Sequence, residues 1–167
     1  MFFVSVDRRD LHFSSAHFIY SENFREPLHG HNYEVRVEVE GELGDSGFVI
    51  NFLELKALAK SVLEKLDHKV LLPLYNPLLK VYQPKGSDEL EEVRVEGKFG
   101  ECYSIPKRDI ALVPIKNTSV EELAEYILNE LLKKMSERRG ITSLSVEVYE
   151  TPAFSARKAK KINTYTL

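Results

Sequence analysis

Hydrophobic and polar residues alternate along two long stretches of the chain, and this pattern predicts β-strands. In residues 31–41 a tyrosine and three valines alternate with charged residues, and residues 143–150 alternate in the same way. Residues 2–6 and 10–19 are rich in phenylalanine, valine and isoleucine and are expected to be extended. We also expect a short edge strand in the tail, residues 160–167.

Two other stretches repeat hydrophobic residues every three or four positions, which predicts amphipathic helices. They span residues 52–66 and 119–138. Each begins at a residue whose side chain can accept a backbone N–H, with a glutamate three residues later, an arrangement typical of a capping box. The pairs are Asn51 with Glu54 and Ser119 with Glu122.

Between the two predicted helices lies a less regular segment, residues 73–116, which is rich in proline and glycine. Within it, residues 90–97 and 98–105 are expected to form a short hairpin, and the polar residues 20–30 are expected to form a loop. The order of elements predicts an α+β fold, with an antiparallel sheet and two helices on one face. We expect the 167 residues to form a single domain, enlarged by the segment 73–116.

Composition narrows the class of protein. The net charge is −3 and 43% of the residues are hydrophobic, so the chain can bury a core and lacks the broad basic face of a nucleic-acid-binding protein. The one cysteine, Cys102, excludes an intrachain disulfide and a cysteine-built zinc site, and we assign it no role. No apolar run approaches the length of a membrane span, and the N-terminus lacks the basic region of a signal peptide. We therefore expect a cytoplasmic protein that binds neither nucleic acid nor a membrane.

The tripeptide His29-Gly30-His31, at the start of the first alternating stretch, is the strongest candidate for chemistry. Residues i and i+2 of a strand point to the same face, so the two imidazoles can lie side by side. If the extended segment that ends near His17 pairs with this strand, three imidazoles converge on one point. Three protein ligands with an open fourth position are typical of catalytic zinc. The alternative is that the two histidines of the tripeptide are ordinary surface residues at a strand end.

Four short segments strengthen the zinc interpretation by their order. They are FSSAH at 13–17, LHGHNY at 28–33, LDH at 66–68 and VEVYET at 146–151. Together they resemble the 6-pyruvoyl-tetrahydropterin synthase and 6-carboxy-tetrahydropterin synthase family over about residues 3 to 155, apart from the segment 73–116, which looks longer than usual. The resemblance implies the tunnelling fold, in which subunits join their sheets into a barrel. It also implies a homo-oligomer, a trimer or a hexamer, with active sites at the subunit interfaces.

The resemblance further implies roles for individual residues. His17, His29 and His31 match the family's Zn²⁺ ligands, and the zinc would polarise oxygen atoms of a pterin triphosphate substrate. Glu150, followed by Thr151 after an alternating strand, matches the residue that anchors the pterin, where a carboxylate can accept two parallel hydrogen bonds from the pterin edge. Taken alone, it could be an ordinary surface residue at a strand end. Ser119 matches a hydroxyl near the pterin, although it is equally explained as a helix cap.

Asp67 and His68 match a proton relay of the family, whereas taken alone this dipeptide is ordinary on a protein surface. A carboxylate that holds one imidazole nitrogen leaves the other free as a base or acid near neutral pH. Because an adjacent residue cannot easily turn its side chain into the same imidazole, we expect another group to hold His68. The role of Asp67 is therefore less firmly predicted than that of His68.

One position departs from the better-known members, which carry a cysteine shortly before His-Gly-His. Here the segment reads Glu26-Pro27-Leu28-His29-Gly30-His31. This resembles the subgroup that uses glutamate and forms 6-hydroxymethyl-7,8-dihydropterin from 7,8-dihydroneopterin triphosphate. We predict that Glu26 is a general base that promotes a retro-aldol break between the first two side-chain carbons; the alternative is that it is an ordinary solvated residue of the loop. The alternatives are a 6-pyruvoyl- or 6-carboxy-tetrahydropterin synthase, and a non-catalytic pterin- or zinc-binding protein.

Overall fold

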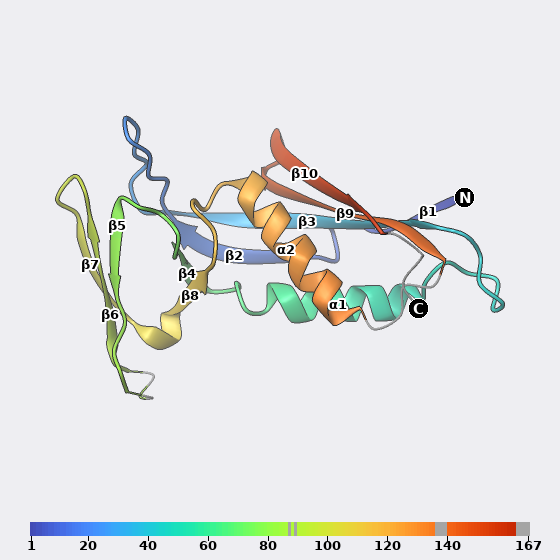
Figure 1. Ribbon diagram of the computed structural model, residues 1–167, viewed down its shortest axis with the longest axis horizontal. Helices are drawn as coiled ribbons and strands as arrows, with labels where there is room; N and C mark the ends of the chain where they lie inside the picture. The colour runs from blue at the N-terminus through green and yellow to red at the C-terminus, as the bar shows by residue number, and fades with distance from the viewer. Residues whose placement is uncertain (87, 89, 136–139, 163–167) are drawn as a thin grey trace.

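The structure, a computed structural model, describes residues 1–86, 88, 90–135 and 140–162. Within these residues, seven strands form a main sheet and three form a smaller sheet, and both α-helices lie on the same side of the main sheet (Figure 1). The α+β class and the two helices on one face are therefore confirmed.

The elements of the two sheets have the following bounds. The main sheet contains β1 (Phe2–Val6), β2 (His12–His17), β3 (His29–Gly41), β4 (Lys69–Pro73), β8 (Ile110–Val113), β9 (Ile141–Thr151) and β10 (Phe154–Lys161). The smaller sheet contains β5 (Leu79–Tyr82), β6 (Glu92–Gly97) and β7 (Cys102–Pro106). The helices are α1 (Phe52–Leu63) and α2 (Val120–Lys134), and a short 3-10 helix spans Lys107–Asp109.

The long strand β3 organises the main sheet, whose order is β10-β9-β3-β2-β4-β8. One edge of β3 pairs with β9. Along its other edge, the first half pairs with β2 and the second half with β1, all antiparallel. The histidine-rich start of β3 therefore lies beside the end of β2.

The core lies between the main sheet and the two helices. The alternating residues of β3 point inward, and Tyr33, Val35, Val37 and Val39 are fully buried. They meet the apolar stripes of the helices, which include Leu55 and Ile127. Burying a side chain of this size contributes about 1.5–3 kcal/mol, so the alternation and the helical stripe fix which faces meet.

Both helices begin where the capping signals predict. Asn51 Oδ1 accepts the N–H of Leu53 at 2.9 Å, and Ser119 Oγ accepts the N–H of Glu122 at 3.5 Å. Neither pair forms a full capping box: Asn51 caps Leu53 rather than Glu54, and the carboxylate of Glu122 accepts the N–H of Lys116 at 2.7 Å.

The helices end earlier than the sequence predicts. The first helix ends at Leu63 rather than at residue 66. The second ends at Lys134, and residues 136–138 of the predicted helix lie outside the described residues.

The segment 73–116 is more ordered than the sequence predicts. The hairpin is confirmed as β6 and β7, and β5 adds a third strand to it. The strands β4 and β8, on either side of this sheet, were not predicted; β4 pairs in parallel with both β2 and β8, so the main sheet is mixed rather than antiparallel. Both strands are short apolar runs without alternation, the pattern of parallel strands covered on both faces, which periodicity alone does not distinguish.

The C-terminal edge strand lies earlier than predicted. It spans Phe154–Lys161 and pairs with β9, whereas residues 163–167 of the predicted strand lie outside the described residues. Its side chains are mostly exposed, so it carries no hydrophobic alternation for the sequence to reveal. No helix among the described residues is both long and apolar enough to cross a membrane.

Candidate metal centre and active site

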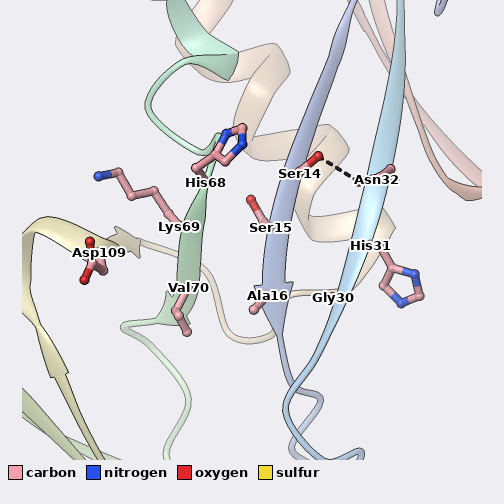
Figure 2. Close-up of a pocket in the computed structure, with 10 residues that line it drawn as sticks. All are labelled: Ser14, Ser15, Ala16, Gly30, His31, Asn32, His68, Lys69, Val70 and Asp109. Atoms are coloured by element: carbon pink, nitrogen blue, oxygen red, sulfur yellow. Dashed lines mark hydrogen bonds between the residues drawn. The ribbon is translucent and has the colours of Figure 1, made fainter.

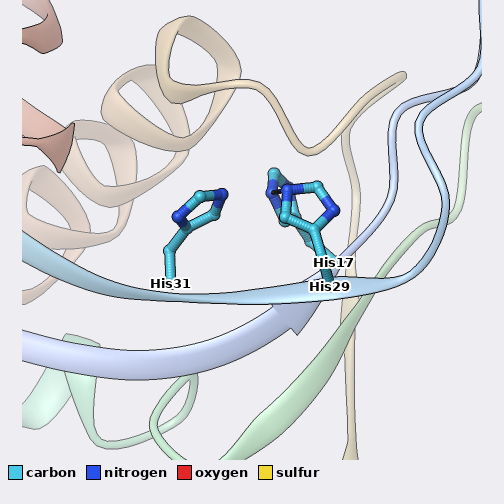
Figure 3. A group of neighbouring side chains, drawn as sticks. All are labelled: His17, His29 and His31. Atoms are coloured by element: carbon cyan, nitrogen blue, oxygen red, sulfur yellow. Dashed lines mark hydrogen bonds between the residues drawn. The ribbon is translucent and has the colours of Figure 1, made fainter.

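Three histidines meet where β2 ends and β3 begins. His17 pairs directly with His29 in the β2–β3 register, and His31 follows two residues along the same face of β3. One ring nitrogen from each residue lies within 4.8 Å of the others, and Figure 3 shows the three rings gathered on one side of the strands. Gly30 needs no special backbone angle here, because it takes part in the regular ladder opposite Ala16.

Hydrogen bonds fix the protonation of two of the imidazoles. His17 Nδ1 lies 3.0 Å from the carbonyl oxygen of Thr118, and His29 Nδ1 lies 2.7 Å from that of Pro27. A carbonyl only accepts, so each Nδ1 carries the proton and each Nε2 offers a lone pair. The two Nε2 atoms lie 3.2 Å apart.

This spacing fits a metal ion. Zinc–nitrogen bonds of about 2.0–2.1 Å in a tetrahedron place two ligand nitrogens about 3.3 Å apart. Burial lowers the pKa of His17 to about 4, against the effect of the Thr118 carbonyl and together with that of the two neighbouring histidines. His17 is therefore neutral at neutral pH, which is the form that binds a metal.

Glu150 lies beside the histidines. Its Oε1 is 3.4 Å from His17 Nε2 and 3.5 Å from His31 Nε2, and its side chain is 27% exposed. The end of β9 thus brings a carboxylate to the point on which the imidazoles converge. The family resemblance predicts that Glu150 binds the pterin; its position next to the candidate metal ligands is visible only in the structure.

Tyr33 is a buried residue that contacts the histidine cluster, and the sequence analysis did not predict it there. Its ring meets those of His17 and His31 edge-on, with centroids 5.8 and 5.6 Å away. Burial raises the pKa of its hydroxyl, and the negative charges of Glu150 and Glu26 raise it further. Its place two residues beyond His31 on the same strand face was a signal that could have identified it.

Glu26 lies on the loop between β2 and β3, close enough to the cluster for its charge to act on Tyr33. Its backbone N–H donates to the carbonyl of Ile19 at 2.9 Å, which ties the loop across its base. The predicted base and the predicted metal ligands are therefore brought to the same end of β3.

Thr118 is a second residue that sequence reasoning missed. It is fully buried just before α2, its hydroxyl donates to the carbonyl of Phe18 at 2.7 Å, and its own carbonyl holds His17. A backbone carbonyl carries no sequence signal, so only its neighbour Ser119 was predicted to lie at the site. Ser119 is confirmed as the N-cap of α2.

Asp67 and His68 do form a pair, contrary to the expectation that another group would hold the imidazole. Asp67 Oδ2 lies 2.9 Å from His68 Nδ1, and Oδ1 accepts the N–H of Ser14 at 2.8 Å. Adjacent side chains can meet because His68 has a φ of 56°, in the left-handed region that non-glycine residues rarely occupy. Partial burial raises the pKa of Asp67, but Ser14 and His68 outweigh it, so the pKa lies below its ordinary value of 3.8.

This pair does not join the histidine cluster within one chain. The His68 side chain is 83% exposed and lines a pocket of about 430 Å³ with Ser14, Lys69 and Asp109; His31 also borders this pocket. Figure 2 shows the imidazole of His31 pointing away from His68, with β2 and β3 between them. One protomer therefore presents the two halves of the predicted site separately.

Comparisons with known proteins agree with this geometry. The family model for 6-pyruvoyl tetrahydropterin synthase matches residues 7–160. A Methanocaldococcus jannaschii protein, provisionally named 6-carboxy-5,6,7,8-tetrahydropterin synthase, is 37% identical over 127 residues, which cover 75% of this chain and 74% of that protein. Dihydroneopterin monophosphate aldolase of Pyrococcus furiosus is 42% identical over 59 residues, 35% of this chain and 50% of its own.

A solved structure extends the agreement to the whole fold. The 6-pyruvoyltetrahydropterin synthase of Plasmodium vivax, in a variant with a catalytic glutamate replaced by alanine, superposes with a TM-score of 0.88. It is 33% identical and covers 96% of this chain and 98% of its own. The tunnelling fold expected from the resemblance is thereby confirmed, and the chain belongs to the 6-pyruvoyl tetrahydropterin synthase family of pterin-biosynthesis enzymes.

Proposed function

We propose that the chain is a zinc-dependent lyase that converts 7,8-dihydroneopterin triphosphate to 6-hydroxymethyl-7,8-dihydropterin. The observation that carries the proposal is the convergence of three imidazole nitrogens at the end of β3, where the carboxylates of Glu26 and Glu150 both act on Tyr33. The only cysteine, Cys102, is exposed in β7 of the smaller sheet. Cys102 is therefore not placed at the histidine cluster, and a carboxylate, that of Glu26, would serve as the base instead of a thiol.

His17, His29 and His31 would hold the zinc. When bound there, zinc supplies a Lewis acid that polarises the side-chain oxygens of the substrate. The fit rests on the donor set, because the Nδ1 hydrogen bonds of His17 and His29 leave both Nε2 lone pairs directed at one point.

Glu26 would act as the general base. It would take the proton from the hydroxyl on the second side-chain carbon, whose bond to the first carbon then breaks. The second carbon leaves as an aldehyde that carries the triphosphate, and the first carbon gains a proton. Asp67 and His68 would deliver that proton, because the carboxylate holds Nδ1 and leaves Nε2 free.

Glu150 and Ser119 would bind the pterin. A partly exposed carboxylate can accept two parallel hydrogen bonds from the pterin edge. The Ser119 oxygen already accepts a backbone N–H, but its own O–H can still donate to a pterin acceptor.

The active site would lie between subunits of a homo-oligomer, a trimer or a hexamer. Support comes from the separation of His68 from the histidine cluster within one protomer, since a second copy can bring its own His68 to the cluster. In a closed symmetric assembly every site is then completed in the same way.

A 6-carboxy-tetrahydropterin synthase is the second candidate. It is favoured by the name of the Methanocaldococcus jannaschii relative, which matches three quarters of the chain. The two candidates share the zinc site and the pterin anchor. Both products keep only the first side-chain carbon, so both need the same carbon–carbon break, and they differ in whether that carbon ends as a hydroxymethyl or a carboxyl group.

The test is incubation of the zinc-loaded protein with 7,8-dihydroneopterin triphosphate, followed by mass spectrometry of the pterins. A 6-hydroxymethyl product together with a two-carbon aldehyde triphosphate would support the proposal, and a 6-carboxy or 6-pyruvoyl product would contradict it. A pterin that binds without turnover would favour a non-catalytic binding protein. Glu26→Gln should lower kcat by about 10²–10⁴-fold with its zinc content unchanged, whereas Glu64→Gln, at an exposed position after α1, should keep full activity.

A further inference from the structure

The small sheet β5–β7 packs against the segment that carries Glu26. Phe18 stacks on Tyr103 of β7 with ring centroids 5.6 Å apart, and Tyr20 meets Phe99 at 5.5 Å. Phe18 and Tyr20 are both buried in a second hydrophobic cluster, separate from the main core. Figure 1 shows this sheet at the end of the main sheet from which the β2–β3 loop emerges. The small sheet therefore packs on the residues that lead into the loop, whereas β8, in the same segment, contributes Ala111 and Val113 to the main core.

The backbone of Tyr20 is held on both sides. Its carbonyl accepts the side-chain amides of Asn76 and Asn117, each at 3.0 Å, and its N–H donates to Asn117 Oδ1 at 3.2 Å. Both lone pairs of one carbonyl are thus occupied by residues that flank the small sheet in sequence. This fixes the start of the loop.

The loop then turns back on itself. Tyr20 and Arg25 form an antiparallel bridge, Ser21 donates its N–H to the carbonyl of Phe24 at 2.8 Å, and Glu26 donates to Ile19 at 2.9 Å. The position of Glu26 therefore depends on how this short turn is anchored.

A charged contact anchors the returning strand. Arg25, adjacent to Glu26, pairs through Nη1 with Glu101 Oε1 of the β6–β7 turn. The Glu101 side chain is only 13% exposed, and its Oε2 is buried without a hydrogen-bond partner. The start of the loop also lies close to the β6–β7 turn, since a Cβ on Gly97 would overlap the Tyr20 hydroxyl. Removing the Glu101 carboxylate from water costs free energy of folding, so the Arg25–Glu101 pair is better explained by a role in placing the loop than by a gain in stability.

We propose that Glu101 is a positioning residue: through Arg25 it holds the 19–26 turn so that Glu26 faces the histidine cluster. The proposal deepens the function proposed above and rests on Glu26 as the base. Zinc and the pterin would be bound by residues of β2, β3, β9 and the start of α2, outside this turn. Loosening the turn should therefore lower kcat and leave KM for the substrate and the zinc content largely unchanged.

The test compares Glu101→Gln with Glu96→Gln. Glu96 is the matched control, because it lies in the same sheet and also pairs with an arginine, and its partners, Arg94 at 2.8 Å and the Tyr82 hydroxyl at 3.1 Å, both belong to the small sheet. We expect E101Q to lower kcat about tenfold, as for a base displaced by a fraction of an ångström, with KM within about twofold of wild type. E96Q should match wild type. Equal melting temperatures would establish that both variants fold.

Two further readouts separate positioning from other roles. In a Glu26→Gln background, the E101Q substitution should cause no further loss of kcat, because a residue that acts only through Glu26 has nothing left to position. By amide hydrogen exchange, the N–H groups of Ser21 and Glu26 should exchange several times faster in E101Q than in E96Q.

The outcomes distinguish the two proposals. An equal loss of kcat with and without the Glu26 carboxylate would overturn the positioning role, as would unchanged exchange at Ser21 and Glu26. Faster exchange with unchanged kcat would also overturn it. Full activity of Glu26→Gln alone would instead contradict the base assigned in the proposed function, while the exchange rates would still show whether Glu101 holds the turn.

Discussion

His17 and His29 face each other across the β2–β3 ladder with their Nε2 atoms 3.2 Å apart. Their Nδ1 atoms lie against the carbonyls of Thr118 and Pro27, so in the neutral form of each ring the proton is assigned to Nδ1 and Nε2 is left with a lone pair. Two lone pairs at this distance repel each other, and the Glu150 carboxylate beside them adds a negative charge. A cation bound between the two Nε2 atoms and the Glu150 carboxylate would attract all three groups and remove this repulsion.

Metal binding should therefore stabilise the fold. Zinc at 100 times its dissociation constant should raise the free energy of unfolding by about 2.7 kcal/mol, because it binds the folded chain and not the unfolded one. The measurement is the melting temperature with zinc and after chelation, together with the metal content. His29→Ala should lose the shift, whereas His12→Ala, at an exposed position of β2, should keep it. A shift that survives in His29→Ala would mean that the stabilising metal binds elsewhere.

The histidine cluster could be predicted from the sequence because strand geometry determines it. Alternation identifies β3, the two-residue period joins His29 to His31, and one antiparallel pairing brings in His17. The same rules do not identify β4 and β8, whose short apolar runs have no period.

The rest of the site depends on contacts that local sequence does not encode. The Thr118 carbonyl that orients His17 belongs to the backbone. The pairing of Asp67 with His68 follows from a left-handed φ that histidine seldom adopts. The position of Glu26 depends on contacts with distant parts of the sequence. Arg25, the residue before Glu26, pairs with Glu101, which lies 76 residues further along the chain.

The Asp67 carboxylate should make stability depend on pH in the acid range. Its pKa lies below 3.8 in the folded chain, so the folded state favours the ionised form. The stabilisation is therefore fully present above about pH 4 and is lost as the pH falls through the lowered pKa. Urea unfolding between pH 5 and pH 2 should show a shallower fall for Asp67→Asn than for wild type. The control is Asp45→Asn, in the exposed loop after β3, which should follow wild type; identical curves for all three proteins would contradict the assignment.

The separation of His68 from the histidine cluster predicts that subunits can complement one another. His68→Ala and Glu26→Gln should each be nearly inactive, since every interface in either assembly lacks one group. If the two variants are unfolded, mixed and refolded, some interfaces combine the intact Glu26 of one copy with the intact His68 of another, and activity should return. Mixing His29→Ala with Glu26→Gln should restore nothing, because both residues lie at the same end of β3, where an intact Glu26 always accompanies a damaged metal site. Native mass spectrometry would confirm that mixed assemblies form; if they form without recovery of activity, His68 does not act across the interface.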